Sequence, residues 1–232
     1  MRLLLTILLL TTGLDLPIPP PRLGPPKNEP PIPEAPEEDP RDTPPPVFYG
    51  EEIECESDTI YYVLDMSGSM QSQTTTRPYV DPDGKITTGN RWERAKAEAI
   101  KSIRGLADSF RFGILVYNCG TDAWSAELRE ATRANKEAAE AWIRRHYWAD
   151  GMTGTGPATS LALRLRTSAV VLLTDGEPNC GANGLQGHRL MISQNNVERA
   201  PITVFGIDAR GEWRAFCQSV AADSGGRYID VP

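Results

Sequence analysis

The stretch that decides the fold spans residues 60–69 and reads Ile60-Tyr61-Tyr62-Val63-Leu64-Asp65-Met66-Ser67-Gly68-Ser69. Its first half is a short apolar run, which is typical of a buried strand. Its second half places one carboxylate and two hydroxyls at alternating positions, with a glycine that allows a tight turn. The stretch therefore predicts a buried strand that ends in a turn rich in oxygen atoms.

The side chains of Asp65, Ser67 and Ser69 supply oxygen atoms, the ligands that hard divalent cations prefer. Two of these three groups are neutral, so a cation bound here would keep much of its charge. Such a cation attracts a carboxylate from outside the chain. A simpler interpretation is that Asp65 and Ser67 only cap the turn that follows the strand.

Apolar runs and amphipathic helices alternate along the rest of the chain. Several of the runs are almost continuously apolar, as in parallel strands that are covered on both faces. The predicted strands are residues 60–64, 112–117, 169–173, 202–205 and 228–231, with a short edge strand at 122–128, and the predicted helices lie at 92–106, 134–147, 158–166 and 213–220. This alternation predicts an α/β fold, a doubly wound and mostly parallel central sheet flanked by helices.

Acidic and hydroxyl side chains follow the predicted strands. In doubly wound sheets, ligands bind at the carboxyl ends of the strands, where the strand order reverses. The run 169–173 is followed by Thr174-Asp175-Gly176-Glu177-Pro178, and a loop rich in glycine and threonine, residues 151–157, precedes that run. Together with the turn after residue 64, these loops bring two aspartates and several hydroxyls to one sheet edge.

This set of motifs resembles the von Willebrand factor type A (VWA) domain, also called the integrin inserted-domain-like fold. The metal-ion-dependent adhesion site (MIDAS) of that family uses Asp-x-Ser-x-Ser, a distant threonine and a distant aspartate. Residues 65–69 match the first part completely, and Asp175 matches the last. Counting back from Leu161 favours Thr155 as the threonine, while the local string around Thr153 keeps that residue as the alternative.

The resemblance implies a complete MIDAS formed by Asp65, Ser67, Ser69, Thr155 and Asp175, with Thr153 as the alternative to Thr155. The implied cation is Mg²⁺, with Mn²⁺ or Ca²⁺ as the other choices. Magnesium prefers octahedral oxygen coordination and keeps waters where the protein leaves gaps. An Asp or Glu of a protein partner would replace one of these waters. The chain is therefore expected to be a metal-ion-dependent protein-binding module without catalytic residues.

Two other function classes stay open. The chain could be a structural or tip subunit of a surface assembly, built on the same domain. A metal-dependent, phosphatase-like enzyme is less favoured, because such sites use more carboxylates. Ser67 also stands where a haloacid-dehalogenase-like phosphatase has its second aspartate. The sequence has neither the GxxxxGK[ST] nucleotide loop nor the GxSxG nucleophile elbow.

The composition fits a globular domain and argues against a nucleic-acid-binding protein. The chain has 232 residues, of which 40% are hydrophobic and 24% are charged, as expected for one globular domain with extensions. The formal net charge is −7 and the basic residues form no cluster. Nucleic-acid binders present a basic patch, so the composition argues against that class.

The N-terminal part has a different composition from the rest. Residues 1–15 begin with a basic residue and a short apolar run, the layout of a secretory signal; an uncleaved anchor is the alternative. Residues 16–51 are proline-rich and acidic and are expected to form a disordered arm or linker. Residues 52–232 are assigned to the VWA domain. The protein is thus expected to be secreted, periplasmic or at the cell surface, with no membrane-spanning segment after signal removal.

The four cysteines, Cys55, Cys119, Cys180 and Cys217, suggest disulfides in an exported protein. Three connectivities are possible, and a bridge from Cys180 to Cys119 or to Cys217 would stiffen the metal edge. Residues 71–90 are expected to form a surface hairpin beside that edge. This insertion and residues 179–196 are candidates for partner specificity, whereas Trp148 is interpreted as a packing residue.

Overall fold

The computed structural model describes residues 43–232. The predicted signal segment, residues 1–15, and the predicted linker up to residue 42 lie outside the described residues. Within the described part, no helix is both long enough and apolar enough to cross a membrane.

A seven-stranded sheet forms the centre of the fold, with the strand order β11-β10-β9-β3-β6-β7 and β8 paired to β6. All pairings among the first five strands of this order are parallel, whereas β7 and β8 run antiparallel to β6. The strands are β3 (Thr59–Asp65), β6 (Arg111–Tyr117), β7 (Thr121–Ala123), β8 (Arg129–Glu130), β9 (Ala169–Thr174), β10 (Ile202–Ile207) and β11 (Tyr228–Val231). The predicted fold class and all five predicted core strands are confirmed. The predicted edge strand at 122–128 is replaced by two shorter strands, β7 and β8.

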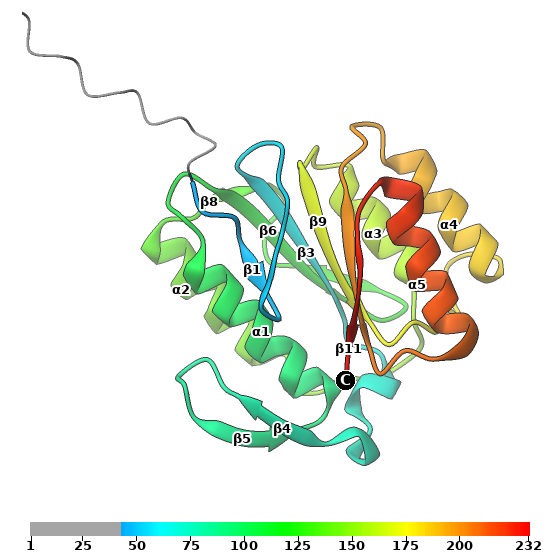
Figure 1. The fold of residues 1–232 in the computed structure, drawn as a ribbon, viewed down its shortest axis with the longest axis horizontal. Helices are drawn as coiled ribbons and strands as arrows, with labels where there is room; N and C mark the ends of the chain where they lie inside the picture. The colour runs from blue at the N-terminus through cyan, green and yellow to red at the C-terminus, as the bar shows by residue number, and fades with distance from the viewer. Residues whose placement is uncertain (1–42) are drawn as a thin grey trace, which may run out of the picture. The chain divides into compact units, whose positions relative to one another are not determined.

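Helices cover both faces of the sheet, as Figure 1 shows. Helices α1 (Arg91–Gly105) and α2 (Arg133–Arg145) lie on one face, and α3 (Thr155–Leu163), α4 (Gly184–Asn195) and α5 (Gly211–Ser224) lie on the other. Alternate residues of β3 point to opposite faces. Tyr62 and Leu64 therefore join the core under α1 and α2, while Tyr61 and Val63 join the core under the other helices.

Local sequence signals explain where the helices begin and end. At the start of α1, the backbone N–H of Glu93 donates to Asn90 Oδ1 (2.9 Å) and the N–H of Asn90 donates to Glu93 Oε2 (2.8 Å), which is a capping box. Helix α5 ends at Gly225, whose φ of 75° is left-handed. Helix α4 was not expected, because only His188 and Ile192 of that helix are buried and no apolar stripe marks it.

A short hairpin precedes the central sheet. Strands β1 (Val47–Phe48) and β2 (Glu51–Glu52) pair in an antiparallel manner. Phe48 is fully buried, and its ring centroid lies 4.8 Å from that of Phe205 in β10. The boundary predicted between linker and domain, at residues 51 and 52, falls inside this hairpin. The proline-rich composition of residues 16–51 gave no sign that Phe48 packs into the core.

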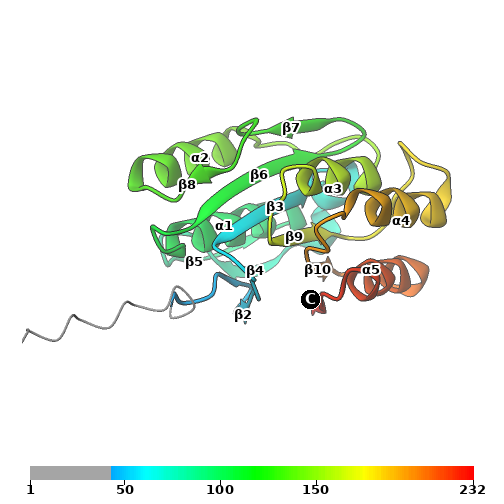
Figure 2. The ribbon, with the colours of Figure 1, turned by 90° about the horizontal axis from the view of Figure 1, so that it is seen from above.

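The insertion after β3 contains two short 3₁₀ helices, η2 (Gly68–Gln71) and η3 (Gln73–Thr75), and a hairpin of β4 (Arg77–Val80) and β5 (Ile86–Gly89). The predicted hairpin is thus present. Its tip, however, lies away from the predicted metal edge. Arg104, in the last turn of α1, donates to Asp83 Oδ1 at 3.1 Å, whereas α1 begins at that edge. Figure 2 shows β4 and β5 beside α1.

The close packing of Gly113 against Tyr61 yields a stability prediction. These residues are direct neighbours in β6 and β3, and a Cβ atom at Gly113 would lie 2.3 Å from Tyr61 Cε2. We expect Gly113→Ala to lower the free energy of unfolding by about 1–3 kcal/mol, because the ring must move in a filled core. Urea unfolding followed by circular dichroism measures this effect. Combining the substitution with Tyr61→Leu should recover part of the loss.

The matched control is Gly105→Ala. No atom lies within 4 Å of a Cβ built at Gly105, so this variant should be neutral or slightly stabilising. A Gly113→Ala protein as stable as the wild type would contradict the predicted packing.

Candidate metal centre

The parallel strands bring polar side chains to one edge of the sheet. Asp65 ends β3, Tyr117 ends β6, Thr174 ends β9 and is followed by Asp175, and Asp208 follows the end of β10. Because these strands are parallel, their carboxyl ends share that edge.

Asp65 lies at the centre of this edge and is fully buried. Its Oδ1 atom accepts a hydrogen bond from the backbone N–H of Ser67 at 2.8 Å. Its Oδ2 atom accepts one from the hydroxyl of Thr174 at 2.6 Å and a longer one from the hydroxyl of Tyr117 at 3.4 Å. The carboxylate therefore joins three strands and fixes the start of the loop that follows β3.

The hydroxyls of Ser67 and Ser69 lie next to each other, with 3.2 Å between their Oγ atoms. The loop that carries them is held by the loop before α3, since the N–H of Gly68 donates to the carbonyl of Gly151 at 2.9 Å. A Cβ at Gly68 would stand only 3.3 Å from that carbonyl oxygen. The glycine of the motif thus permits the close approach of the two loops.

The two candidate threonines have different surroundings. The Thr155 hydroxyl lies 3.3 Å from the hydroxyl of Tyr117, which in turn contacts Asp65. Thr153 engages through its backbone: its N–H donates to Asn179 Oδ1 at 2.8 Å, and its carbonyl accepts from the N–H groups of Asn179 and Cys180. Both threonines are buried, but only the Thr155 side chain is connected to Asp65 by hydrogen bonds.

Asp175 occupies the other side of the edge. Its Oδ2 atom accepts a hydrogen bond from Arg91 Nη1 at 2.9 Å. Its Oδ1 atom is buried and has no hydrogen-bond partner. Such an unsatisfied charged atom is costly unless something else compensates it. The structure thus presents one free carboxylate oxygen at this edge.

A cluster of ion pairs lies behind Asp175. Arg91 also donates through Nε to Asp208 Oδ2 at 3.1 Å, and Arg77 and Arg94 reach the same carboxylate at 2.9 and 3.2 Å. Asp208 has only 5% of its side chain exposed. These pairs connect Asp175 to the hairpin strand β4, to α1 and to the end of β10.

Sequence reasoning assigned no role in the site to four residues of this edge: Tyr117, Thr174, Arg91 and Asp208. The first two could have been found, because Tyr117 ends a predicted strand and Thr174 adjoins Asp175. No pattern in the sequence marks Arg91 or Asp208, since they meet only in the folded chain. Glu177, two positions after Asp175, is exposed.

The two aspartates share an environment that disfavours their charges. Burial, and then the charge of Asp175, raise the pKa of Asp65 from 3.8 to about 7, against the opposing effect of hydrogen bonds from Ser67 and Thr174. Burial also raises the pKa of Asp175, while Ser69 and Arg91 favour its charged form. A positive charge between the carboxylates would relieve both effects.

The donor set fits a hard cation. It consists of carboxylate and hydroxyl oxygens, the groups that Mg²⁺ and similar ions prefer. The 3.2 Å spacing of the serine Oγ atoms is near the separation of about 3 Å between neighbouring ligands of an octahedral ion with bonds of about 2.1 Å. Within residues 43–232, no three His, Cys, Asp or Glu side chains gather into a metal-binding group. Any cation at this edge would thus rely on hydroxyls together with two carboxylates.

One disulfide links two loops of this edge. Cys119, just after β6, is bonded to Cys180, which follows Asp175 by five positions. One of the pairings that the sequence left open is thus confirmed, whereas Cys55 and Cys217 are free thiols. The Thr153 backbone lies against Asn179 and Cys180, and the N–H of Gly154 donates to the carbonyl of Asn118 at 2.7 Å. The bridge therefore braces the threonine loop from both sides.

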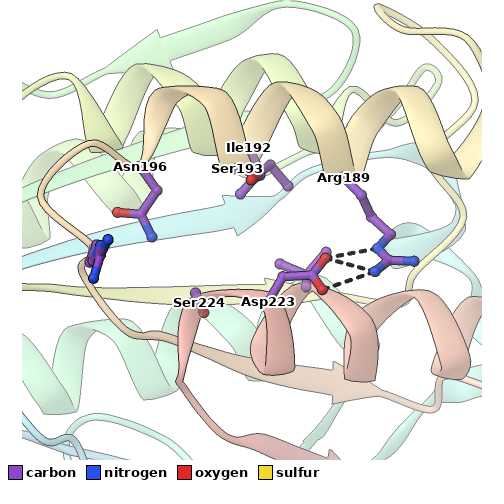
Figure 3. Close-up of a pocket in the computed structure, with 8 residues that line it drawn as sticks. Arg189, Ile192, Ser193, Asn196, Asp223 and Ser224 are labelled. Atoms are coloured by element: carbon purple, nitrogen blue, oxygen red, sulfur yellow. Dashed lines mark hydrogen bonds and ion pairs between the residues drawn. The ribbon is translucent and has the colours of Figure 1, made fainter.

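A hollow of about 300 Å³ lies elsewhere, between α4 and α5 (Figure 3). None of the five predicted site residues lines it. Arg189 crosses it and forms two hydrogen bonds, both 2.9 Å long, with the carboxylate of Asp223. The charges of this pair offset each other. The hollow is therefore a polar gap between two packed helices.

The raised pKa of Asp65 makes the stability of the metal-free protein depend on pH. Between pH 3.8 and about 7, the Asp65 carboxyl group carries a proton more often in the folded protein than in the unfolded chain. The contribution of Asp65 to the free energy of unfolding therefore falls as pH rises through this window and is constant above it. In chelator, Asp65→Asn should gain stability relative to the wild type from pH 5 to about 7. Urea unfolding at each pH measures the difference, and a pH-independent difference would count against the pKa assignment.

The disulfide yields a second prediction for this edge. Cys119 and Cys180 are 61 positions apart, and closing a loop of this length stabilises a protein by up to about 4 kcal/mol. We expect the Cys119→Ser/Cys180→Ser variant to unfold at lower urea concentration than the wild type. A reductant should shift the wild type towards the variant and leave the variant unchanged. If the reductant has no effect on the wild type, the bond does not contribute as expected.

No protein-family model and no curated protein matches the sequence. Solved structures do match the fold. A von Willebrand factor type A protein from Catenulispora acidiphila aligns with a TM-score of 0.60 and 18% identity over 75% of this chain and 38% of the other. The conserved hypothetical protein BatB from Bacteroides thetaiotaomicron aligns with a TM-score of 0.55 and 20% identity, over 75% of this chain and 89% of the other.

A third similar structure is the manganese-loaded TRAP protein of Plasmodium vivax, with a TM-score of 0.50 and 20% identity over 78% of this chain and 70% of the other. Identities this low show the fold alone. The sheet order, the helical layers and these likenesses together show that the described part of the chain has a VWA-like fold.

Proposed function

We propose that this chain is a protein-binding module that binds its partner through a divalent cation. The observation that carries this proposal is the unpartnered, buried Oδ1 atom of Asp175, at an edge where Asp65 and two serine hydroxyls also gather. This arrangement supports cation binding because a cation would satisfy that atom and offset the raised pKa values of both aspartates.

We assign Ser67 and Ser69 as direct ligands, with Asp65 and Asp175 binding directly or through water. Thr155 is the preferred threonine, because its hydroxyl is connected to Asp65 through Tyr117. When bound, the cation supplies a positive charge that accepts a carboxylate oxygen. Mg²⁺ is the proposed ion, with Mn²⁺ or Ca²⁺ as substitutes.

Binding rather than catalysis suits the state of the carboxylates. Both oxygens of Asp65 accept hydrogen bonds, and Asp175 Oδ2 is paired with Arg91. These contacts fix the two groups in place, as suits carboxylates that hold a bound ion. Phosphatase activity that depends on Asp65 would contradict this assignment.

We further propose that the protein acts outside the cytoplasm. The Cys119–Cys180 bridge supports this location, since such bonds persist in oxidising compartments. A role as a subunit of a surface assembly is the second candidate. One structure with a similar fold is the PilB minor pilin from Streptococcus sanguinis, with a TM-score of 0.55 and 12% identity over 78% of this chain and 58% of that one, so a pilus subunit can be built on this fold.

Removing either aspartate should weaken cation binding. We expect Asp65→Ala and Asp175→Ala to weaken Mn²⁺ binding to the full chain by about tenfold or more, because each supplies one of the two negative charges of the site. Paramagnetic resonance of free Mn²⁺ during titration measures the affinity directly. Competition with Mg²⁺ then gives the affinity for the proposed ion.

Two matched controls accompany this titration. Glu177→Gln removes an exposed negative charge near the site and should leave the affinity unchanged. Thr155→Val should weaken binding more than Thr153→Val, because Thr153 engages through its backbone. Wild-type affinity in both aspartate variants would rule out the proposed metal site.

A further inference from the structure

Three large apolar side chains are exposed beside the candidate metal centre. Tyr147 is 80% exposed, Trp148 is 60% exposed and Met152 is 53% exposed. They lie within six positions of one another in the segment between α2 and α3. The sequence had favoured a packing role for Trp148, and its exposure overturns that interpretation. The other large exposed apolar residues of the described part are distributed over β1, the β4–β5 hairpin and the α4 region.

The segment that carries these side chains is fixed to the candidate metal loop. The N–H of Asp150 donates to the carbonyl of Met66 at 3.0 Å, and the carbonyl of Gly151 accepts from Gly68 at 2.9 Å. The N–H of Ala149 donates to Gln71 Oε1 at 3.1 Å, and Ala149 itself is buried. The backbone thus faces inward, while the neighbouring Trp148 side chain is left to solvent.

The start of the segment is also held in place. Trp92 Nε1 donates to the carbonyl of His146 at 2.8 Å, and the His146 ring lies 3.0 Å from the carboxylate of Asp122. A surface whose backbone is already ordered loses less entropy when a partner binds. Trp, Tyr and Met are also enriched in protein interfaces, and Trp and Tyr are over-represented among the residues that contribute most to binding.

We infer that Tyr147, Trp148 and Met152 form an anchor surface that acts together with the cation site. Its occupant is a protein segment that carries an Asp or Glu and a large apolar side chain close to it in sequence. This inference rests on the proposed function, which supplies the carboxylate contact. The partner's acid is required by the cation and not by the charge of the segment, which carries an exposed Arg145 and an exposed Asp150, neither with an ion pair among the described residues.

The spacing between the two contacts follows from the chain geometry. Trp148 lies three positions before Gly151, which contacts Gly68 between the two serines. Three residues span at most about 11 Å. An extended partner covers this distance with about three to four residues. The partner's apolar side chain should therefore lie within about four positions of its acid.

A peptide selection on the full chain tests both contacts. A library of random linear peptides is selected on the immobilised protein in magnesium buffer and eluted with chelator. We expect the enriched peptides to share an Asp or Glu with Trp, Phe, Leu or Ile within about four positions. Fluorescence anisotropy of the best peptide should then show loss of binding when its acid is changed to the amide.

The protein variants for this test are Tyr147→Ser/Trp148→Ser and Met152→Ser. Because these side chains are exposed, we expect unchanged melting temperature and unchanged Mn²⁺ affinity, but peptide binding about tenfold or more weaker in the double variant. The matched control is Leu190→Ser/Val197→Ser, which removes two exposed apolar residues of the α4 region and should bind the peptide as the wild type does.

The outcomes separate this inference from the proposed function. If peptide binding needs the acid and the cation but is equal in the Tyr147→Ser/Trp148→Ser variant and the wild type, the anchor surface is wrong and the cation site stands. If no acid-bearing peptide is enriched, or binding survives the chelator, both are overturned. A joint requirement for the acid, the cation and the anchor surface supports both.

Discussion

The buried carboxylate of Asp65 is the contact on which the arrangement of this sheet edge depends. It ends the central strand β3 and has no exposed surface. A charged group can stay there only if its oxygens are engaged. The Ser67 N–H and the Thr174 hydroxyl meet this need, and they belong to the loop after β3 and to the end of β9. Satisfying one carboxylate thus sets the positions of one loop and of the end of a neighbouring strand.

A second consequence concerns charge. The charge of Asp175 raises the cost of ionising Asp65, and Arg91 pairs with only one oxygen of Asp175. Arg91 is itself shared with Asp208, which two further arginines contact. The guanidinium is therefore held back from the free Oδ1 atom of Asp175. Although three arginines lie nearby, the negative charge of the two aspartates at this edge is not fully neutralised.

Much of this arrangement follows from the sequence. The five core strands are apolar runs and the helix start at Asn90 is a local signal, so pattern alone predicts them. The loops after parallel strands must also meet at one edge, so topology alone predicts that Asp65 and Asp175 lie close together. Arg91 and Asp208 escape prediction because their pairing joins residues 117 positions apart. The direction in which a loop side chain points is also hidden, and Trp148 is the clearest case.

Trp148 and Ala149 show how one segment serves two purposes. The Ala149 N–H is bound to Gln71 in the loop after β3, so Ala149 is buried, whereas its neighbour Trp148 is 60% exposed. The same hydrogen bonds that position the candidate ligands Ser67 and Ser69 therefore also present an aromatic side chain to a partner. A change that loosened the segment would weaken both at once. Because one segment positions both the candidate ligands and the anchor surface, we expect a single partner to contact the cation and the anchor surface together.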